Sequence, residues 1–284
     1  MMTQRNSPPE PSLVTVDGAE IATWVLEPDG PAAGEVVLCH GTPWSSQIWW
    51  TAAHDLSQDF RVFLWDMPGY GASEKSARVS VDLASQGRRL AQLVHGWGLV
   101  RPHLVAHDVG GAVALRAHLM HGIDYADLFL WDVVTLDPWG SPFFRLVSDN
   151  TEVFAQLPPA LHAALLKEYI AGSSRGLLSA RDIDVLARPW LDGAGQAAFY
   201  RQIAALETAD TRPIVARLGE VRCRTRIGWG SADPWIPCAQ AYELQARLPG
   251  PAEVVELAGI GHLAPVECPS GVITAIRTWL AAPG

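Results

Sequence analysis

Short runs of apolar residues alternate along this chain with segments in which apolar residues recur at helical spacing. Eight runs have the length and composition of buried strands: Leu13–Val16, Ile21–Leu26, Glu35–Cys39, Phe60–Trp65, His103–Ala106, Leu128–Val134, Arg226–Trp229 and Glu253–Leu257. Helical spacing covers Val81–Trp97, Gly110–His121 and Gly271–Leu280. This alternation predicts an α/β fold with a mostly parallel sheet flanked by helices. In such a sheet, functional residues lie at the carboxyl ends of the strands.

The alternation is interrupted between Asp137 and Pro213, where no strand pattern is found. This stretch is rich in aromatic residues and has three helix-like blocks, at Thr151–Ala155, Ala160–Ala171 and Gly195–Glu207. We therefore expect a core formed by residues 12–137 and 213–284, with an inserted helical cap formed by residues 138–212. Residues 1–11 are polar and proline-rich, which predicts a flexible tail.

Composition narrows the class of protein. Of the 284 residues, 49% are hydrophobic and 18% are charged, which excludes general disorder. The net charge of −9, without a basic cluster, argues against a nucleic-acid partner. The four cysteines have no metal-binding spacing, so we expect neither a metal nor another cofactor. No apolar run has membrane-spanning length and no signal peptide is recognised, which predicts a cytoplasmic protein without membrane contact. Nothing in the pattern indicates the oligomeric state.

The segment after the fifth apolar run has the layout of a nucleophile elbow, a sharp turn from strand to helix that lifts one side chain above the sheet. The usual pattern is small-x-Ser-x-Gly, and here Ala106 and Gly110 frame Asp108 at the serine position. A carboxylate attacks amides and esters poorly, but it can displace a leaving group from saturated carbon and form an alkyl ester. The alternative is that Asp108 only caps the following helix. The partners that follow along the chain favour a nucleophile.

Two of these partners follow later strands, in the chain order nucleophile, acid, histidine. Asp233 lies in Gly230-Ser-Ala-Asp-Pro, after the seventh run, and His262 lies in Gly259-Ile-Gly-His, after the eighth. His262 can act as a general base, while Asp233 can fix its tautomer and stabilise the imidazolium. Each loop alone is an ordinary turn, but the three residues in this order form a specific combination.

The chain resembles the α/β-hydrolase superfamily in its aspartate-nucleophile branch, which comprises epoxide hydrolases, haloalkane dehalogenases and fluoroacetate dehalogenases. The likeness is carried by His40-Gly-Thr-Pro43, by Asp66–Ser73, by the elbow and by the two loops above. It implies the α/β-hydrolase fold and an oxyanion hole formed by the backbone N–H groups of Thr42 and Val109. Some relatives carry the acid at the position of Asp132, which is therefore an alternative to Asp233.

The leaving-group site departs from each subfamily. Haloalkane dehalogenases place halide donors where this chain has Val109 and Thr42, and the His-Trp pair of fluoroacetate dehalogenases is missing. Epoxide hydrolases use two cap tyrosines, whose ordinary pKa of about 10 suits a developing alkoxide. Ala198-Phe-Tyr-Arg resembles the motif of one of them and implies that Tyr200 is the acid. Phe154 lies near the expected place of the other. An alternative is that Tyr169 substitutes for it from another helix, but its apolar neighbours predict that it packs.

The resemblance thus implies an epoxide hydrolase that acts on an apolar small molecule. We expect its pocket to be lined by aromatic residues, namely Trp44, Trp139, Phe143, Phe154 and Trp235. A dehalogenase of haloalkane or haloacid type and a hydrolase or decarboxylase of strained lactones stay open. A ligand-binding protein that keeps the fold without turnover is a further alternative. The complete set of Asp108, His262 and Asp233 argues against it, since a receptor needs no such triad.

Overall fold

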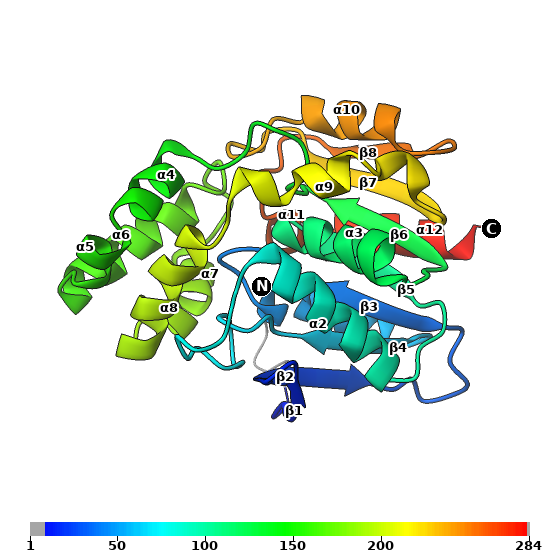
Figure 1. Ribbon diagram of the computed structural model, residues 1–284. Coiled ribbons are helices and arrows are strands. Elements are labelled where there is room, and N and C mark those ends of the chain that lie inside the picture. Colours follow the sequence, from blue (N-terminus) through cyan, green and yellow to red (C-terminus); the bar gives the residue numbers. More distant parts are fainter. Residues whose placement is uncertain (1–8, 283–284) are drawn as a thin grey trace.

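The computed structural model describes residues 9–282, and its core is one eight-stranded sheet (Figure 1). The strands are β1 (Ser12–Val16), β2 (Ala19–Leu26), β3 (Glu35–Cys39), β4 (Arg61–Trp65), β5 (His103–His107), β6 (Asp127–Trp131), β7 (Arg224–Gly230) and β8 (Glu253–Leu257). Their order across the sheet is β1-β2-β4-β3-β5-β6-β7-β8. β2 pairs with β1 and β4 in antiparallel fashion, and the remaining neighbours are parallel. The predicted mostly parallel sheet is confirmed.

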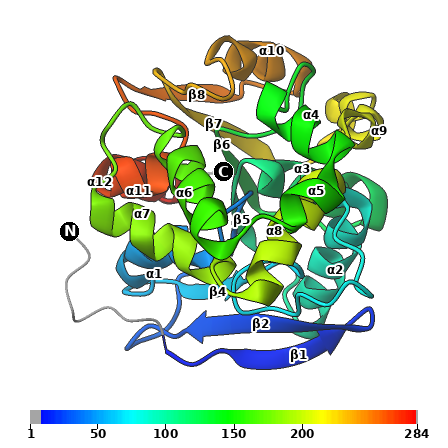
Figure 2. The same ribbon diagram turned by 90° about the vertical axis from the view of Figure 1, so that its left-hand side faces the viewer.

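Helices cover both faces of this sheet (Figure 2). Those of the core are α1 (Trp50–Leu56), α2 (Leu83–Gly96), α3 (Val109–His121), α10 (Ala239–Arg247), α11 (Ala264–Glu267) and α12 (Pro269–Ala281). α2 packs on α3 over one face, and α1 packs on α12 over the other. Because the central strands are covered on both sides, every residue of β6 and nearly every residue of β5 is buried.

β6 is shorter than expected. The prediction placed a strand at Leu128–Val134, but β6 ends at Trp131. The next residue, Asp132, has a left-handed φ of 45°, which an extended strand cannot contain. The apolar run continues because Val133 and Val134 remain buried in the turn that follows. The apolar run therefore predicted correctly that this segment is buried, but incorrectly that all of it is an extended strand.

The segment between β6 and β7 is helical. It contains α4 (Pro142–Asp149), α5 (Thr151–Ala155), α6 (Pro159–Ala171), α7 (Ala180–Ala187), α8 (Gly193–Ala204) and α9 (Arg212–Val215). It also has short 3₁₀ turns at Arg188–Trp190, Thr208–Asp210 and Leu218–Glu220. Helices α4 to α8 gather at one end of the sheet (Figure 1). They stand over the loops that follow the parallel strands.

Most of the expected flexible tail, residues 1–8, lies outside the described residues. Of its remaining residues, Pro9 is anchored, because its carbonyl accepts a hydrogen bond from the indole Nε1 of Trp24 at 2.8 Å. Within the described chain, no helix combines the length and the apolar character needed to cross a membrane.

Candidate active site

Asp108 lies at the turn between β5 and α3 with a strained backbone, φ 53° and ψ −129°. This conformation costs free energy in a residue other than glycine, so the surroundings must hold it in place. The backbone N–H of Asp108 donates to Trp131 at 3.1 Å, and its carbonyl accepts from Val134 at 3.1 Å. A Cβ at Gly110 would lie only 2.3 Å from the carbonyl oxygen of His40. The elbow motif thus needs glycine at this position because α3 begins directly against the β3 loop.

The two carboxylate oxygens of Asp108 have different surroundings. Oδ1 accepts a hydrogen bond from the backbone N–H of Thr42 at 2.7 Å. Oδ2 lies 3.3 Å from Nε2 of His262, without the alignment of a hydrogen bond. Burial alone would raise the pKa of Asp108, but the contact with His262 and the charge of His262 outweigh it, so the pKa lies below its usual value. The carboxylate is therefore ionised.

His262 lies between two carboxylates. Its side chain is fully enclosed, and its Nδ1 lies 2.8 Å from Oδ2 of Asp233. The other oxygen of Asp233 accepts from the backbone N–H groups of Trp235 and Ile236, at 2.7 and 2.9 Å. Burial lowers the pKa of His262, but the charge of Asp233 and the contact with Asp108 raise it well above its ordinary value. The imidazole is thus fixed with Nδ1 toward Asp233 and Nε2 toward Asp108.

The backbone of the His262 loop is held from three sides. Its N–H donates to the carbonyl of Ser173 at 2.9 Å, and its carbonyl accepts from Nε2 of His107 at 2.8 Å. Glu267 accepts from the backbone of Gly261 at 2.8 Å and of Leu263 at 3.0 Å. Burial lowers the pKa of His107 to about 4, so its ring is neutral and Nε2 carries the proton. The sequence placed Glu267 in this loop and gave no signal of this function.

Asp132, the alternative acid, does not bind His262. Its Oδ1 accepts from the backbone N–H of Gly230 at 2.7 Å, and its Oδ2 is buried with no hydrogen-bond partner in the described chain. Burial and the charge of nearby Asp233 raise the pKa of Asp132 well above its usual value. Asp132 thus ties the end of β6 to β7, and the carboxylate in contact with His262 is that of Asp233.

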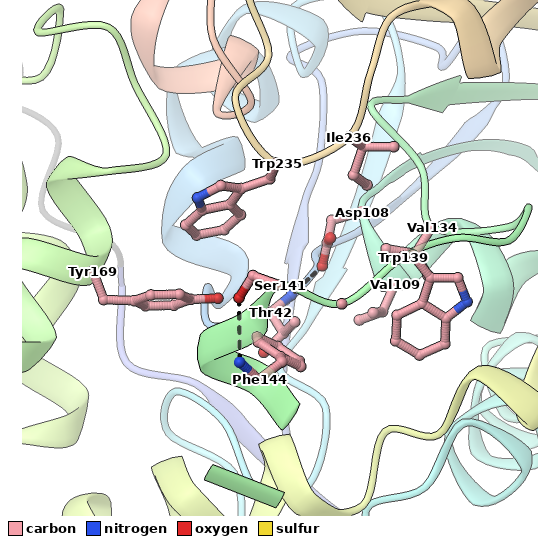
Figure 3. Close-up of a pocket in the computed structure, with 11 residues that line it drawn as sticks. Thr42, Asp108, Val109, Val134, Trp139, Ser141, Phe144, Tyr169, Trp235 and Ile236 are labelled. Atoms are coloured by element: carbon pink, nitrogen blue, oxygen red, sulfur yellow. Dashed lines mark hydrogen bonds between the residues drawn. The ribbon is translucent and has the colours of Figure 1, made fainter. Parts of the chain in front are cut away.

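A small cavity opens above Asp108 (Figure 3). It is lined by Thr42, Asp108, Val109, Val134, Trp139, Gly140, Ser141, Phe144, Tyr169, Trp235 and Ile236. Two of the five expected aromatic residues, Trp139 and Trp235, are among them. The other three do not line it: Trp44 stacks on Trp235, Phe143 packs on Tyr169, and Phe154 packs on Tyr200. The sequence missed Val134, Gly140, Ser141, Phe144 and Ile236, because loop and helix-cap residues carry no periodic signal.

Tyr200, the expected leaving-group acid, is not among the residues that line this cavity. It is fully buried in α8, and its hydroxyl lies 2.9 Å from Nδ1 of His162. Nε2 of His162 must donate to the carbonyl of Trp190, 2.9 Å away, and burial lowers the pKa of His162. The ring is therefore neutral and Nδ1 accepts the proton of Tyr200. The expectation for Tyr200 needs correction, since its proton is directed into the helices and away from Asp108.

Tyr169, which the sequence predicted to pack, does line the cavity. It comes from α6, and its hydroxyl points into the cavity toward Ser141 (Figure 3). Its ring stacks on Trp235 at 4.8 Å between centroids. Burial and the charge of Asp108 raise the pKa of Tyr169 well above its usual value, so the phenol keeps its proton. By contrast, the indole N–H of Trp139 already donates to Thr211 at 3.2 Å.

A comparison of the sequence with known protein families agrees with the chain order and the geometry of Asp108, Asp233 and His262. A model of the alpha/beta hydrolase family matches residues 36–275. The chain belongs to this family. Its aspartate at position 108 stands where the elbow of many α/β hydrolases has a serine.

Similar proteins differ in what their names describe. An alpha/beta hydrolase fold protein from Burkholderia ambifaria has a solved structure with a TM-score of 0.88 and 37% identity, covering 94% of this chain and 97% of that one. The enol-lactonase from Burkholderia xenovorans LB400 has a TM-score of 0.78 and 20% identity, covering 95% and 100%, which shows the fold alone. A dihydrolipoyllysine-residue acetyltransferase component of the acetoin cleaving system from Pseudomonas putida is 25% identical over 276 residues, 91% of this chain and 66% of that one. The reaction of this α/β hydrolase must therefore be inferred from its site.

The site of this α/β hydrolase combines a carboxylate, an imidazole and a phenol around an apolar cavity. Among residues 9–282, no group of three or more His, Cys, Asp and Glu residues is arranged to hold a metal ion. The chemistry available from the described side chains is nucleophilic attack by a carboxylate, proton donation by a phenol and activation of water by an imidazole.

Proposed function

We propose that this α/β hydrolase cleaves a small apolar substrate through an ester on Asp108, and that the substrate is an epoxide. The observation that carries the proposal is the asymmetric environment of the Asp108 carboxylate. Oδ1 is held by the N–H of Thr42 at 2.7 Å, and Oδ2 lies 3.3 Å from His262. A group that served only as a helix cap would bond to the first turn of α3, but the Asp108 side chain makes no such cap bond.

In the first step, Oδ2 of Asp108 attacks one epoxide carbon and the carbon–oxygen bond on that carbon breaks. The departing oxygen takes the phenolic proton of Tyr169, which leaves a hydroxyalkyl ester and a phenolate. Tyr169 suits this role because its raised pKa keeps it protonated until an alkoxide forms. The ester has no charge, so one of the two carboxylates that raise the pKa of His262 is lost. The imidazolium can then return a proton to the phenolate and become a base.

In the second step, His262 takes a proton from water and the resulting hydroxide adds to the carbonyl carbon of Asp108. The oxyanion forms beside the backbone N–H groups of Thr42 and Val109. The tetrahedral species then collapses and expels the diol oxygen, which takes the proton of the new carboxyl group. Asp108 is again a carboxylate and His262 an imidazolium. The net reaction adds one water to one epoxide.

Two features favour oxygen over halide as the leaving atom. A halide needs N–H donors that are free to bind it, but the indole N–H of Trp139 is engaged with Thr211, and the backbone N–H of Thr42 already donates to Oδ1 of Asp108. An opening epoxide oxygen needs an acid, and the Tyr169 hydroxyl projects into the cavity. The cavity walls are otherwise mostly apolar, which suits an uncharged substrate.

A single turnover in ¹⁸O-water tests the covalent step. With enzyme in excess over styrene oxide, the oxygen passed to the product comes from Asp108. We therefore expect mostly unlabelled diol, with the label on the Asp108 peptide by mass spectrometry. Asp108→Asn should give no product and no label. Labelled diol together with unlabelled protein would mean direct attack by water and would exclude the ester mechanism.

A substrate screen tests the leaving group. Epoxides, haloalkanes, haloacids and strained lactones are each offered to the wild type and to Asp108→Asn. We expect turnover of epoxides that the variant loses. Halide release without epoxide turnover would replace the epoxide proposal by a dehalogenase, and lactone opening alone would replace it by a lactone hydrolase. Binding detected by thermal stabilisation without any product would favour the ligand-binding alternative.

A further inference from the structure

The loop that carries Thr42 is held by the inserted helices as well as by the core. Oε1 of Gln202, on α8, accepts the hydroxyl proton of Thr42 at 2.6 Å. The indole Nε1 of Trp190 donates to the carbonyl of Pro43 at 2.9 Å. Two consecutive residues of the oxyanion loop are thus bonded to side chains from residues 188–204. These bonds span more than 140 residues of sequence, so no local pattern could have predicted them.

Burying the side-chain amide of Gln202 costs free energy. Gln202 is fully buried, and its Oε1 also accepts the hydroxyl proton of Tyr70 at 2.8 Å, which uses both lone pairs. Its Nε2 has no hydrogen-bond partner within the described chain. A buried amide with unsatisfied N–H groups destabilises a fold, so its presence calls for a compensating role. The role that the geometry offers is to fix the hydroxyl of Thr42.

Fixing the side chain of Thr42 also fixes its backbone N–H. This N–H donates to Oδ1 of Asp108 at 2.7 Å, and a Cβ at Gly41 would collide with Asp108, so the loop lies tightly against the nucleophile. A donor in an oxyanion hole stabilises the transition state only when it is aimed in advance at the oxygen that becomes charged. A loop with a glycine at 41 has backbone freedom that must be restrained.

We propose that Gln202 is a positioning residue that aims the oxyanion N–H of Thr42 at Asp108, so that the inserted helices help assemble the catalytic site. This inference rests on the proposed function of Asp108. Trp190 supports the same loop, and the chain of bonds continues from Trp190 to His162 and Tyr200. The proton of Tyr200 thus belongs to this network.

The proposal predicts which catalytic step is affected. The oxyanion forms when water attacks the ester, so a misaimed N–H slows ester hydrolysis more than it slows alkylation of Asp108. In Gln202→Leu, we expect hydrolysis of the ester formed from styrene oxide to slow by about 10- to 100-fold, less than the 10²–10³-fold loss typical of deleting a donor. The ester should therefore accumulate on the Asp108 peptide during turnover, as seen by acid quench and mass spectrometry.

Matched variants separate positioning from structural damage. Thr42→Val keeps the backbone N–H and removes the hydroxyl, so it should accumulate the ester as Gln202→Leu does, and Thr42→Ser, which keeps the hydroxyl, should accumulate less ester than Thr42→Val. Gln196 on the same helix is also buried, but within residues 9–282 its side-chain amide donates to the carbonyls of Ala155 and Leu157 and not to the loop of Thr42. Gln196→Leu should lower Tm without ester accumulation.

A second measurement needs no substrate. The Thr42 amide proton, bonded to a carboxylate, should resonate downfield in a ¹⁵N–¹H spectrum, move upfield in Gln202→Leu and stay in place in Gln196→Leu. The proposal would be overturned if Gln202→Leu accumulated no more ester than the wild type and left the chemical shift of the Thr42 amide unchanged. Equal effects in Gln196→Leu would also overturn it. If His262→Gln forms no ester with styrene oxide, the proposed function fails instead, and the amide measurement still decides the role of Gln202.

Discussion

The two carboxylate oxygens of Asp108 contact different partners, and at the scale of single residues this difference determines what each oxygen can do. Because Thr42 holds Oδ1, the carboxylate cannot rotate freely, and Oδ2 stays on the side of His262. One oxygen is thus already in an oxyanion site while the other is available for attack. A serine at this position would offer one oxygen for attack, and the oxyanion would then be the carbonyl oxygen of the substrate.

The same scale yields a prediction about two tyrosines. Tyr169→Phe removes a hydroxyl that faces the cavity, so it should lower epoxide turnover by about 10²–10⁴-fold, the range of general-acid catalysis. Tyr200→Phe removes a hydroxyl bonded to His162, so its loss should be smaller and should come with reduced stability. Steady-state kinetics with styrene oxide and thermal unfolding of both variants check this. A larger kinetic loss in Tyr200→Phe would return the acid role to that residue.

Sequence reasoning predicted polar residues at strand ends well and side chains on helices poorly. Asp108, Asp233 and His262 each follow a parallel strand, so the topology alone brings them to one edge of the sheet. Which tyrosine faces the cavity depends on how α6 and α8 are rotated against the core. Tyr169 and Tyr200 both lie among apolar neighbours, so helical spacing could not separate them.

At the scale of elements, the apolar runs located all eight strands, and β3 and β8 have the predicted bounds. The central parallel strands are buried on both faces, so a continuous apolar run marks them directly, whereas β8 at the edge of the sheet is only partly buried. Helices α1, α4, α7, α9, α10 and α11 were not predicted, because short helices carry too few turns to show a period. Two of them do have capping residues: Ser141 accepts from the N–H of Phe144 before α4, and Ser179 accepts from the N–H of Asp182 before α7.

The turn after β6 gives a prediction about stability. Asp132 has a raised pKa, so the folded protein gains relative stability from it below its unfolded pKa of 3.8 and loses that gain as pH rises above this value. An asparagine side chain in its place keeps the acceptor for Gly230, tolerates φ 45° and has no charge to bury. Asp132→Asn should therefore raise Tm at pH 7, by about 2–4 °C for each kcal/mol gained.

The gain in Tm of Asp132→Asn should shrink as the pH of the thermal melts approaches 4. The variant should keep its activity, because the carboxylate that contacts His262 is that of Asp233. Asp233→Asn is the matched variant, and it should lose most of its turnover. If Asp132→Asn were instead inactive with its fold intact, Asp132 would be the functional acid. A gain in Tm that did not depend on pH would show that burial of the charge is not its cause.

At the scale of the whole molecule, the site exists only where distant parts of the chain meet. Thr42 follows β3, Asp108 follows β5, and Asp233 and His262 follow β7 and β8, while Tyr169 comes from the helices between β6 and β7. Two carboxylates therefore face one imidazole in a buried place, and each ionisation depends on the others. The sequence predicted the two carboxylates and the imidazole as members of this set, but not Tyr169, and the effects of these groups on one another follow only from the assembled fold.

This assembly predicts that the two catalytic steps respond differently to pH. Alkylation needs ionised Asp108, whose pKa is lowered, so it should persist in mildly acidic solution. Ester hydrolysis needs neutral His262, whose pKa is raised by Asp233 and Asp108, and esterification removes only the contribution of Asp108. Hydrolysis should therefore slow as pH falls, and the ester on Asp108 should accumulate. Acid quench and mass spectrometry during styrene oxide turnover, between about pH 5 and pH 9, measure this fraction. An ester fraction that rose with pH would contradict His262 as the base.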